Sequence, residues 1–279
     1  MLQLFSPAKI NLFLRIINKR PDGYHNLSSL FQTIDFCDIL TFDLNNEQKD
    51  ILTCSDKTLA TDETNLVLKA TKLFREKSGI PIYLKIHLQK NIPLQAGLGG
   101  GSGNAATTLW GLNALTNSTI ATSELMSWGA EIGSDVAFFL SHGTAYCTGR
   151  GEKIQEVSCL PKTIVTIVKP DVNLPTPAVY KELNVKYEEQ VTNDFENILT
   201  GKIDYFNDLE PPAFKISPEL FDLKQKLLSS GFHTVVLSGS GSSFFCLGDG
   251  DLDSRKNLMI FKTCFIQRNS HQWFKTRVI

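Results

Sequence analysis

Apolar and polar residues alternate most clearly over positions 82–89, where every even position is aliphatic and every odd one is polar or aromatic. A period of two predicts a β-strand with one buried face. Strands are also predicted over 10–16, 30–44 and, more briefly, 51–54. Along the first of these strands, Lys9 and Asn11 share the face opposite the aliphatic side chains.

Helical spacing of apolar residues marks 65–77, which Gly79 can terminate. Further helices are predicted over 104–115, over 123–132 with Ser123 as the cap, from Asp135 to 140, and over 218–229. Turns are predicted at 19–23 and within a strand pair at 143–151, and a loop at 186–193. The second half adds strands over 163–168, 235–237, 244–247 and 258–266, and a proline-rich helix entry at 174–177.

Strands and helices are therefore mixed without strict β-α-β alternation. This arrangement predicts two α+β units with a cleft between them. The boundary is expected near Cys159, which gives an N-terminal domain over 1–158 and a C-terminal domain over 159–279.

A glycine-rich stretch, residues 92–106, lies between a predicted strand and a predicted helix. Its glycines can curl the backbone and present N–H groups at a helix N-terminus, where an anion is favoured. It lacks the Lys-Ser or Lys-Thr pair of a Walker A loop and the glycine spacing of a dinucleotide fold. A flexible linker is disfavoured by its tight placement, so a phosphate cradle is the better interpretation.

The composition excludes several classes of function. The net charge is −1, so no overall basic field is available to hold nucleic acid or an anionic membrane. No apolar run is long enough to span a bilayer, and the N-terminus does not read as a secretory signal. The six cysteines are scattered without a Cys-x-x-Cys pair, which disfavours zinc and disulfides and favours a cytoplasmic location with reduced thiols.

Single residues leave the chemistry open. The segment 149–151 is interpreted as a hairpin, while 239–241 fits either a tight hairpin or backbone that approaches a ligand. Lys9 alone could be a solvated strand residue, and Asp135 alone could be a helix cap. Together with Ser102 and the glycine loop they supply the parts of a phosphoryl-transfer site, so the residues indicate a nucleotide- or phosphate-binding enzyme.

Three blocks, 6–12, 92–106 and 237–241, make the chain resemble the GHMP kinase superfamily over nearly its whole length. The resemblance implies a ribosomal-protein-S5-like N-terminal domain, a ferredoxin-like C-terminal domain and an active site in the cleft. A further block over 19–35, with 133–136 and 174–177, is similar to the branch whose substrate is a polyol linked to cytidine diphosphate. That branch transfers phosphate from ATP to the polyol's 2-hydroxyl, in the non-mevalonate route to isoprenoid precursors.

The resemblance also implies roles for particular residues. Asp135 would accept or orient the hydroxyl proton, and Lys9 would pair with it and offset charge on the phosphoryl group. The implied ATP-binding residues are Asn65, Lys90, Pro93, Gln95, Ala96, Gly97, Leu98, Gly99, Gly100, Gly101, Ser102, Gly103 and Asn104, with Ser102 near Mg²⁺. The implied substrate-binding residues are Asn11, Tyr24, His25, Thr176, Tyr180, Gly239 and Ser240. Tyr24 and Tyr180 would sandwich the cytosine, and His25 would read its edge. Whether Asp135 is a base or an electrostatic positioner stays open.

Two positions depart from the family pattern. Gln95 stands where a small residue is usual, and Gly103 stands where serine is frequent. Neither change removes a group that the chemistry needs. The resemblance implies small-molecule partners only and a monomer or weak homodimer. The competing hypotheses are a GHMP kinase for another alcohol, of the homoserine or mevalonate type, and a non-catalytic nucleotide sensor on the same fold.

Overall fold

The computed structural model describes residues 1–183, 192–252 and 257–275; the predicted loop at 186–193 therefore lies mostly outside the described residues. The strands are β1 (Leu2–Lys19), β2 (His25–Leu44), β3 (Ile51–Cys54), β4 (Leu84–Gln89), β5 (Thr144–Gly149), β6 (Lys153–Glu156), β7 (Ile164–Pro170), β8 (Phe206–Asn207), β9 (Thr234–Leu237), β10 (Phe244–Leu247) and β11 (Leu258–Cys264). The helices are α1 (Leu66–Ser78), α2 (Gly100–Leu115), α3 (Thr122–Ile132), α4 (Val136–Phe139), α5 (Thr176–Lys181), α6 (Asp194–Leu199), α7 (Glu210–Ile216) and α8 (Pro218–Ser229).

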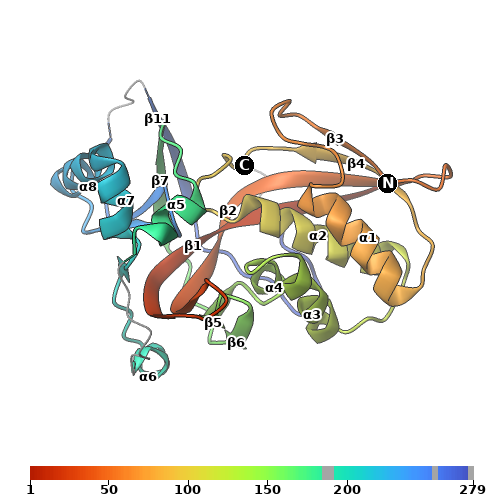
Figure 1. The fold of residues 1–279 in the computed structure, drawn as a ribbon, viewed down its shortest axis with the longest axis horizontal. Helices are drawn as coiled ribbons and strands as arrows, with labels where there is room; N and C mark the ends of the chain where they lie inside the picture. The colour runs from red at the N-terminus through yellow and green to blue at the C-terminus, as the bar shows by residue number, and fades with distance from the viewer. Residues whose placement is uncertain (184–191, 253–256, 276–279) are drawn as a thin grey trace.

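Two sheets organise the chain (Figure 1). The first runs in the order β3-β4-β2-β1-β8, with β5 and β6 continuing from β2, and the second runs β11-β7-β10-β9. Strands β1 and β2 form one long antiparallel hairpin across the turn at 20–24. Its length explains why β2 can pair with β4 through 39–44 and with β5 through 27–32.

Three apolar clusters hold these layers together. The first packs the first sheet against α1, α2, α3 and α4, which lie together in Figure 1. The second joins β1 to the second sheet through side chains such as Ile10 and Ile167. The third packs α5, α7 and α8 on the second sheet and on the end of β1. Strand β1 thus contributes to the contact between the two sheets.

The strands and helices confirm most of the predicted elements, although β1 and β2 begin earlier than predicted, at Leu2 and His25, and α6 and β8 were not predicted. Three further differences concern α2, α3 and α7. Helix α2 begins at Gly100 rather than at 104, because Gly99, with φ +69°, turns the chain directly into the helix. Helix α3 begins at Thr122, and its N-cap is Ala121 rather than Ser123. Helix α7 was not predicted; its two prolines occupy the first helical turn, where no N–H is needed.

Two further connections could not be read from local patterns. Strand β8 runs parallel to β1 and returns the chain to the first sheet. At the C-terminal end, the Trp273 indole donates to the Phe5 carbonyl and packs in the first cluster. The predicted domain boundary at 158–159 falls between β6 and β7 and stays a prediction. Within the described ranges, no helix is long and apolar enough to cross a bilayer.

Candidate active site

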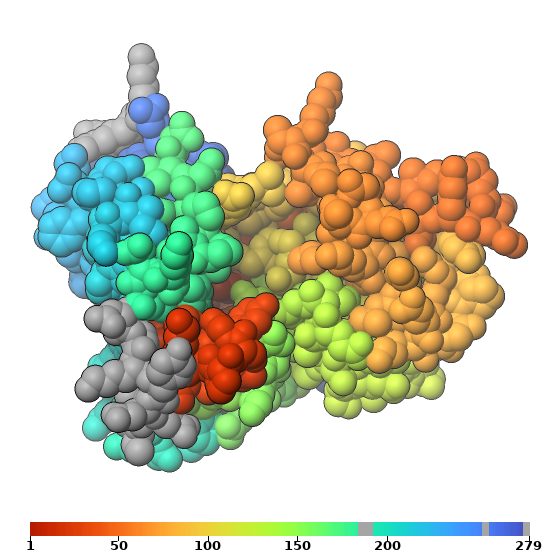
Figure 2. Space-filling view, viewed as in Figure 1, coloured from red at the N-terminus to blue at the C-terminus, as the bar shows by residue number. Residues whose placement is uncertain are grey.

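A cavity of about 840 Å³ opens where the β1–β2 turn, the glycine loop, α5 and the β9–β10 loop meet. Figure 2 shows the molecule hollowed between α5 and α1, beside the β1–β2 turn. Of the residues expected at the site, the cavity is lined by Lys9, Asn11, Tyr24, His25, Lys90, Pro93, residues 95–102, Asp135, Thr176, Tyr180, Gly239 and Ser240. Asn65, Gly103 and Asn104 do not line it.

Lys9 and Asp135 form an ion pair inside this cavity. The Lys9 ammonium lies 3.4 Å from Asp135 Oδ2, donates to Asn11 Oδ1 at 2.6 Å and lies 4.8 Å from the centre of the Phe31 ring. The Lys9 side chain is 4% exposed and the Asp135 side chain 27%. The buried Lys9 ammonium therefore pairs with a carboxylate that is partly open to solvent. A substrate in the cavity could reach the Asp135 carboxylate from that side.

The backbone fixes both partners. The Lys9 N–H donates to the Leu98 carbonyl at 2.9 Å, which ties β1 to the glycine loop. Asp135 is the N-cap residue of α4, yet its side chain makes no capping hydrogen bond. The alternative role of Asp135 as a simple side-chain cap therefore lacks its defining contact.

The glycine loop ends in the N-terminus of the 16-residue helix α2, whose first turn contains Ser102. Gly97 (φ +73°) lies against the β9–β10 loop so closely that a β-carbon there would overlap the Ser238 carbonyl. The Ser238 hydroxyl donates to the Gly97 carbonyl at 3.0 Å, and Ser243 N–H donates to the Ala96 carbonyl at 3.3 Å. The hairpin interpretation of 239–241 is thus confirmed; Gly239 and Ser240 also line the cavity, and their approach to a ligand stays a prediction.

The β9–β10 loop is held in place from two sides. The Asn207 amide on β8 donates to the carbonyls of Leu237 and Gly239, each at 2.7 Å. The hydroxyls of Thr176 and Ser240 lie 2.7 Å apart, which links α5 to the same loop. Residues far apart in the sequence therefore position this wall of the cavity.

Aromatic residues line the other end of the cavity. The rings of His25 and Tyr180 lie 5.4 Å apart, and Tyr24 is 55% exposed at the β1–β2 turn. Burial lowers the pKa of His25, with a smaller effect from Lys19, so the imidazole is neutral near pH 7. Burial also raises the pKa of the Tyr180 phenol, and the Asp135 charge adds to this shift. A flat apolar base with hydrogen-bonding edges matches such walls.

Of the three expected nucleotide residues that do not line the cavity, Asn65 and Gly103 have structural roles. The Asn65 side chain caps α1 by accepting from Val67 N–H at 3.0 Å. A β-carbon at Gly103 would lie 2.8 Å from the Pro7 carbonyl, so close packing of α2 on β1 accounts for glycine there. Asn104 is buried, and its Oδ1 has no hydrogen-bond partner within the described ranges.

Lys90 lines the cavity and is already paired. Its ammonium lies 2.6 Å from Asp38 Oδ2, and both side chains are buried. The other Asp38 oxygen accepts from the backbone N–H groups of Asn91 and Ile92, each at 2.8 Å. Asp38, which the sequence analysis missed, therefore fixes the entry to the glycine loop.

Gln95 is exposed at the crest of the glycine loop and has φ +50°. A non-glycine residue in this left-handed region is strained unless the surroundings compensate. Gln95 lines the cavity.

Two further residues of the site escaped the sequence analysis. Ser29 accepts from the Asn11 amide at 2.9 Å and donates to the Phe13 carbonyl. Arg150 lines the cavity from the β5–β6 turn. The position of Arg150 between two glycines could have indicated a role in the site. Ser29 carried no such signal, because its partners Asn11 and Phe13 lie on β1.

Comparison with known proteins agrees with this geometry. The family model of the GHMP kinase N-terminal domain matches residues 65–143, and that of the GHMP kinase C-terminal domain matches 192–257. The chain is 55% identical, over 99% of its length and 93% of the relative's, to 4-diphosphocytidyl-2-C-methyl-D-erythritol kinase of Protochlamydia amoebophila (strain UWE25).

Solved structures give the same result. A crystal structure of 4-(cytidine 5'-diphospho)-2C-methyl-D-erythritol kinase matches with a TM-score of 0.76 and 31% identity, over 95% of this chain and 99% of that chain. Homoserine kinase from Cytophaga hutchinsonii matches with a TM-score of 0.71 and 18% identity, over 96% of each chain, which shows the shared fold alone.

The two α+β domains and the glycine loop between them define a GHMP kinase, as predicted from the sequence. Within that superfamily, the chain belongs to the 4-diphosphocytidyl-2-C-methyl-D-erythritol kinases. Membership of a kinase family implies the use of ATP.

Proposed function

We propose that this protein transfers the γ-phosphoryl group of ATP to the 2-hydroxyl of 4-diphosphocytidyl-2-C-methyl-D-erythritol, a step in the synthesis of isoprenoid precursors. The observation that carries the proposal is the Lys9–Asp135 ion pair, 3.4 Å apart, in a cavity that also contains the glycine loop and the aromatic end. The family of the chain supports the same reaction.

The proposed role of each residue follows from its position in the cavity. The α2 N-terminus and the N–H groups of residues 97–102 would bind the ATP phosphates. Asp135 would orient the acceptor hydroxyl and take its proton, and Lys9 would stabilise negative charge that develops on the transferring group. Asn11 would hold the neighbouring hydroxyl of the polyol.

The other end of the cavity would select the substrate. Tyr24 and Tyr180 would stack on the two faces of the cytosine, as flat rings favour. His25, held neutral by burial, would offer one donor and one acceptor to the base edge. Thr176, Gly239 and Ser240 would line the passage between the base and the glycine loop.

Magnesium would enter with the nucleotide. Within the described residues, no group of three or more His, Cys, Asp or Glu could hold a metal ion. This fits Mg²⁺, which proteins commonly hold through substrate phosphates and one or two side chains. The Ser102 hydroxyl on the cavity wall is the expected protein ligand. When bound, the ion would neutralise phosphate charge.

The test is a side-by-side assay with Mg-ATP and three alcohols. Turnover of the diphosphocytidyl substrate, with homoserine and mevalonate inert, is the expected result. Turnover of homoserine or mevalonate instead would overturn the proposal. Binding of both substrates without turnover would identify a nucleotide sensor. A monomer or weak homodimer and a cytoplasmic location stay predictions, which gel filtration and fractionation can check.

A further inference from the structure

Arg150 lies on the cavity wall at the tip of the β5–β6 hairpin. Its guanidinium carbon is 5.0 Å from the centre of the Tyr24 ring. The residue therefore connects a hairpin of the first sheet to the aromatic end of the cavity. None of the roles proposed above uses this cation.

The β5–β6 turn is built to hold Arg150 in this place. The Arg150 backbone N–H donates to Glu152 Oε2 at 2.6 Å, and Nε lies 4.0 Å from the same oxygen. Gly149 has φ +69°, and a β-carbon there would lie 2.7 Å from the Glu152 carboxylate. Glu152 thus holds the backbone end of the residue. Within the described ranges, no hydrogen bond engages the two terminal nitrogens of the guanidinium.

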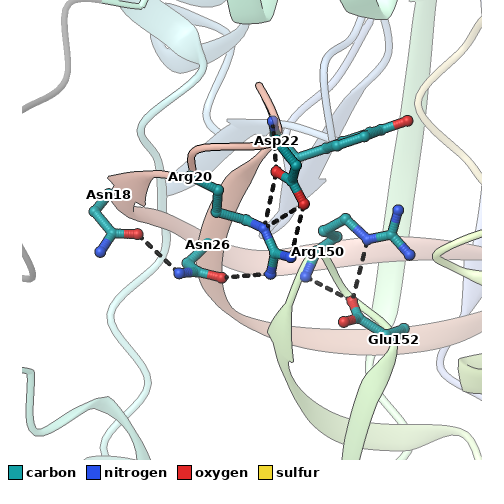
Figure 3. A network of polar contacts seen from close by, with 7 residues as sticks. Asn18, Arg20, Asp22, Asn26, Arg150 and Glu152 are labelled. Carbon is teal, nitrogen blue, oxygen red and sulfur yellow. Dashed lines mark hydrogen bonds and ion pairs between the residues drawn. The ribbon is translucent and has the colours of Figure 1, made fainter. Parts of the chain in front are cut away.

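The two charged groups of the β1–β2 turn, Arg20 and Asp22, form hydrogen bonds with each other and, within the residues that the structure describes, none with Arg150. Arg20 donates to Asp22 through Nε and Nη2, at 3.1 and 2.8 Å, and Asp22 also accepts from Tyr24 N–H. This hydrogen bond from Arg20 is the main cause that lowers the pKa of Asp22. Figure 3 shows the two turns side by side, each with its own carboxylate. Arg20 is therefore the main partner of Asp22, to whose lowered pKa Arg150 adds a smaller effect, and the terminal N–H donors of Arg150 remain available to a ligand.

The next residue along the turn reaches the ion pair. A β-carbon at Gly151 would lie 3.4 Å from Asp135 Oδ1. The Arg150–Gly151 segment thus extends from the Tyr24 ring to the Asp135 carboxylate. A substrate whose base stacks on Tyr24 and whose hydroxyl meets Asp135 must carry its linking group past this segment.

We propose that Arg150 binds the diphosphate that links cytidine to the polyol, and so selects a nucleoside-diphosphate ester over a free alcohol. This inference rests on the proposed function. A guanidinium presents paired N–H donors that match phosphate oxygens, and it stacks on an aromatic face at the same time. Of the other cations that line the cavity, Lys9 is engaged by Asn11 and Asp135, and Lys90 by Asp38. Lys19 and Lys181 also line it, but Arg150 is the cation that lies over the Tyr24 ring.

The test measures how tightly CDP and cytidine bind by calorimetry. A non-hydrolysable ATP analogue is present at saturation, so that CDP cannot occupy the glycine loop. In the wild type, CDP is expected to bind more tightly than cytidine. Arg150→Gln is expected to weaken CDP about ten- to a hundred-fold, the range for hydrogen bonds to charged groups, and to leave cytidine within about two-fold.

Two variants make the comparison specific. Arg150→Lys keeps the charge without the paired donors, and is expected to recover part of the CDP affinity. Lys153→Gln removes the same charge from an exposed site on the same hairpin, outside the cavity, and is expected to match the wild type.

The outcomes separate the inference from the function on which it rests. CDP binding by Arg150→Gln that equals the wild type would overturn the inference alone. Equal losses for CDP and cytidine would also overturn it, because Arg150 would then act only by supporting the Tyr24 ring. A wild type that binds neither ligand would overturn the proposed function and the inference together.

Discussion

The Lys9 ammonium donates to Asn11 Oδ1 at 2.6 Å, and the Asn11 amide nitrogen donates in turn to the Ser29 hydroxyl. The Ser29 hydroxyl donates its one hydrogen bond to the Phe13 carbonyl, so its oxygen can only act as an acceptor toward Asn11. This series of hydrogen bonds fixes the orientation of the Asn11 amide, with its oxygen toward Lys9. The ion pair with Asp135 therefore depends on a serine that does not touch the cavity.

We predict that Ser29→Ala lowers kcat about five-fold, as expected when a hydrogen bond worth about 1 kcal/mol that aligns Asn11 is lost, and leaves the KM for ATP unchanged. Ser28→Ala is the matched control, because the Ser28 hydroxyl bonds to Asp194 at 2.7 Å, away from the ion pair. Steady-state kinetics of both variants check this. Equal effects of the two substitutions would reduce Ser29 to a structural residue.

Asp135→Asn should lower kcat by about 10²- to 10⁴-fold, the range for loss of a group that handles a proton. The affinity for ATP should stay close to that of the wild type, because the glycine loop does not depend on this carboxylate. Single-turnover kinetics and direct ATP binding measure the two quantities. A variant that keeps most of its kcat would show that Asp135 has only a structural role.

His25→Ala is expected to raise the KM for the cytidine substrate about five-fold or more and to change the KM for ATP little. The reason is that His25 lies beside Tyr180 at the aromatic end of the cavity. A neutral imidazole that pairs with a base edge contributes about 1 kcal/mol or more. Kinetics with each substrate varied in turn decide this, and equal losses for both substrates would misplace the base pocket.

The lowered pKa of His25 also predicts a pH dependence of stability. The unfolded chain takes up a proton near pH 6.5, whereas the folded chain resists it until a lower pH. His25 therefore costs no stability above about pH 7, and stability is lost as the pH falls through the unfolded value toward the folded one. Urea unfolding at pH 7.5 and 5.5 should show a smaller loss for His25→Gln. The same loss of unfolding free energy in the wild type and in His25→Gln would contradict the lowered pKa of His25.

Gly97→Ala tests the contact between the two glycine-bearing loops. Gly79 is the control, since it has φ +71° but nothing within 4 Å of a β-carbon. Gly79→Ala should lower the free energy of unfolding by about 1–2 kcal/mol, the cost of a left-handed backbone. Gly97→Ala should lose about 1–3 kcal/mol more, because its β-carbon overlaps the Ser238 carbonyl. If chemical unfolding shows equal losses of free energy for the two variants, the loops can move apart to accept the β-carbon at no energetic cost.

Local patterns predicted the elements whose signals lie within a few neighbouring residues. The Gly79 end of α1 follows from helix-terminus chemistry, and β4 follows from strict alternation, whereas the Asn65 cap was not predicted. The start of α2 was misplaced because a run of glycines looks like loop, although its glycines occupy the first helical turn. The motifs also indicated the superfamily and the residues expected at its site.

The sequence by itself determined the kind of most elements and the superfamily, and it predicted phosphate binding by the glycine loop, because each depends on residue type and near spacing. Only the tertiary structure decided which distant groups meet. Strand β8 brings Asn207 to the Gly239 carbonyl, and β2 brings Asp38 to Lys90. The β5–β6 hairpin carries Arg150 to the Tyr24 ring. Such contacts depend on strand pairing between distant segments, and local spacing along the chain carries no record of that pairing.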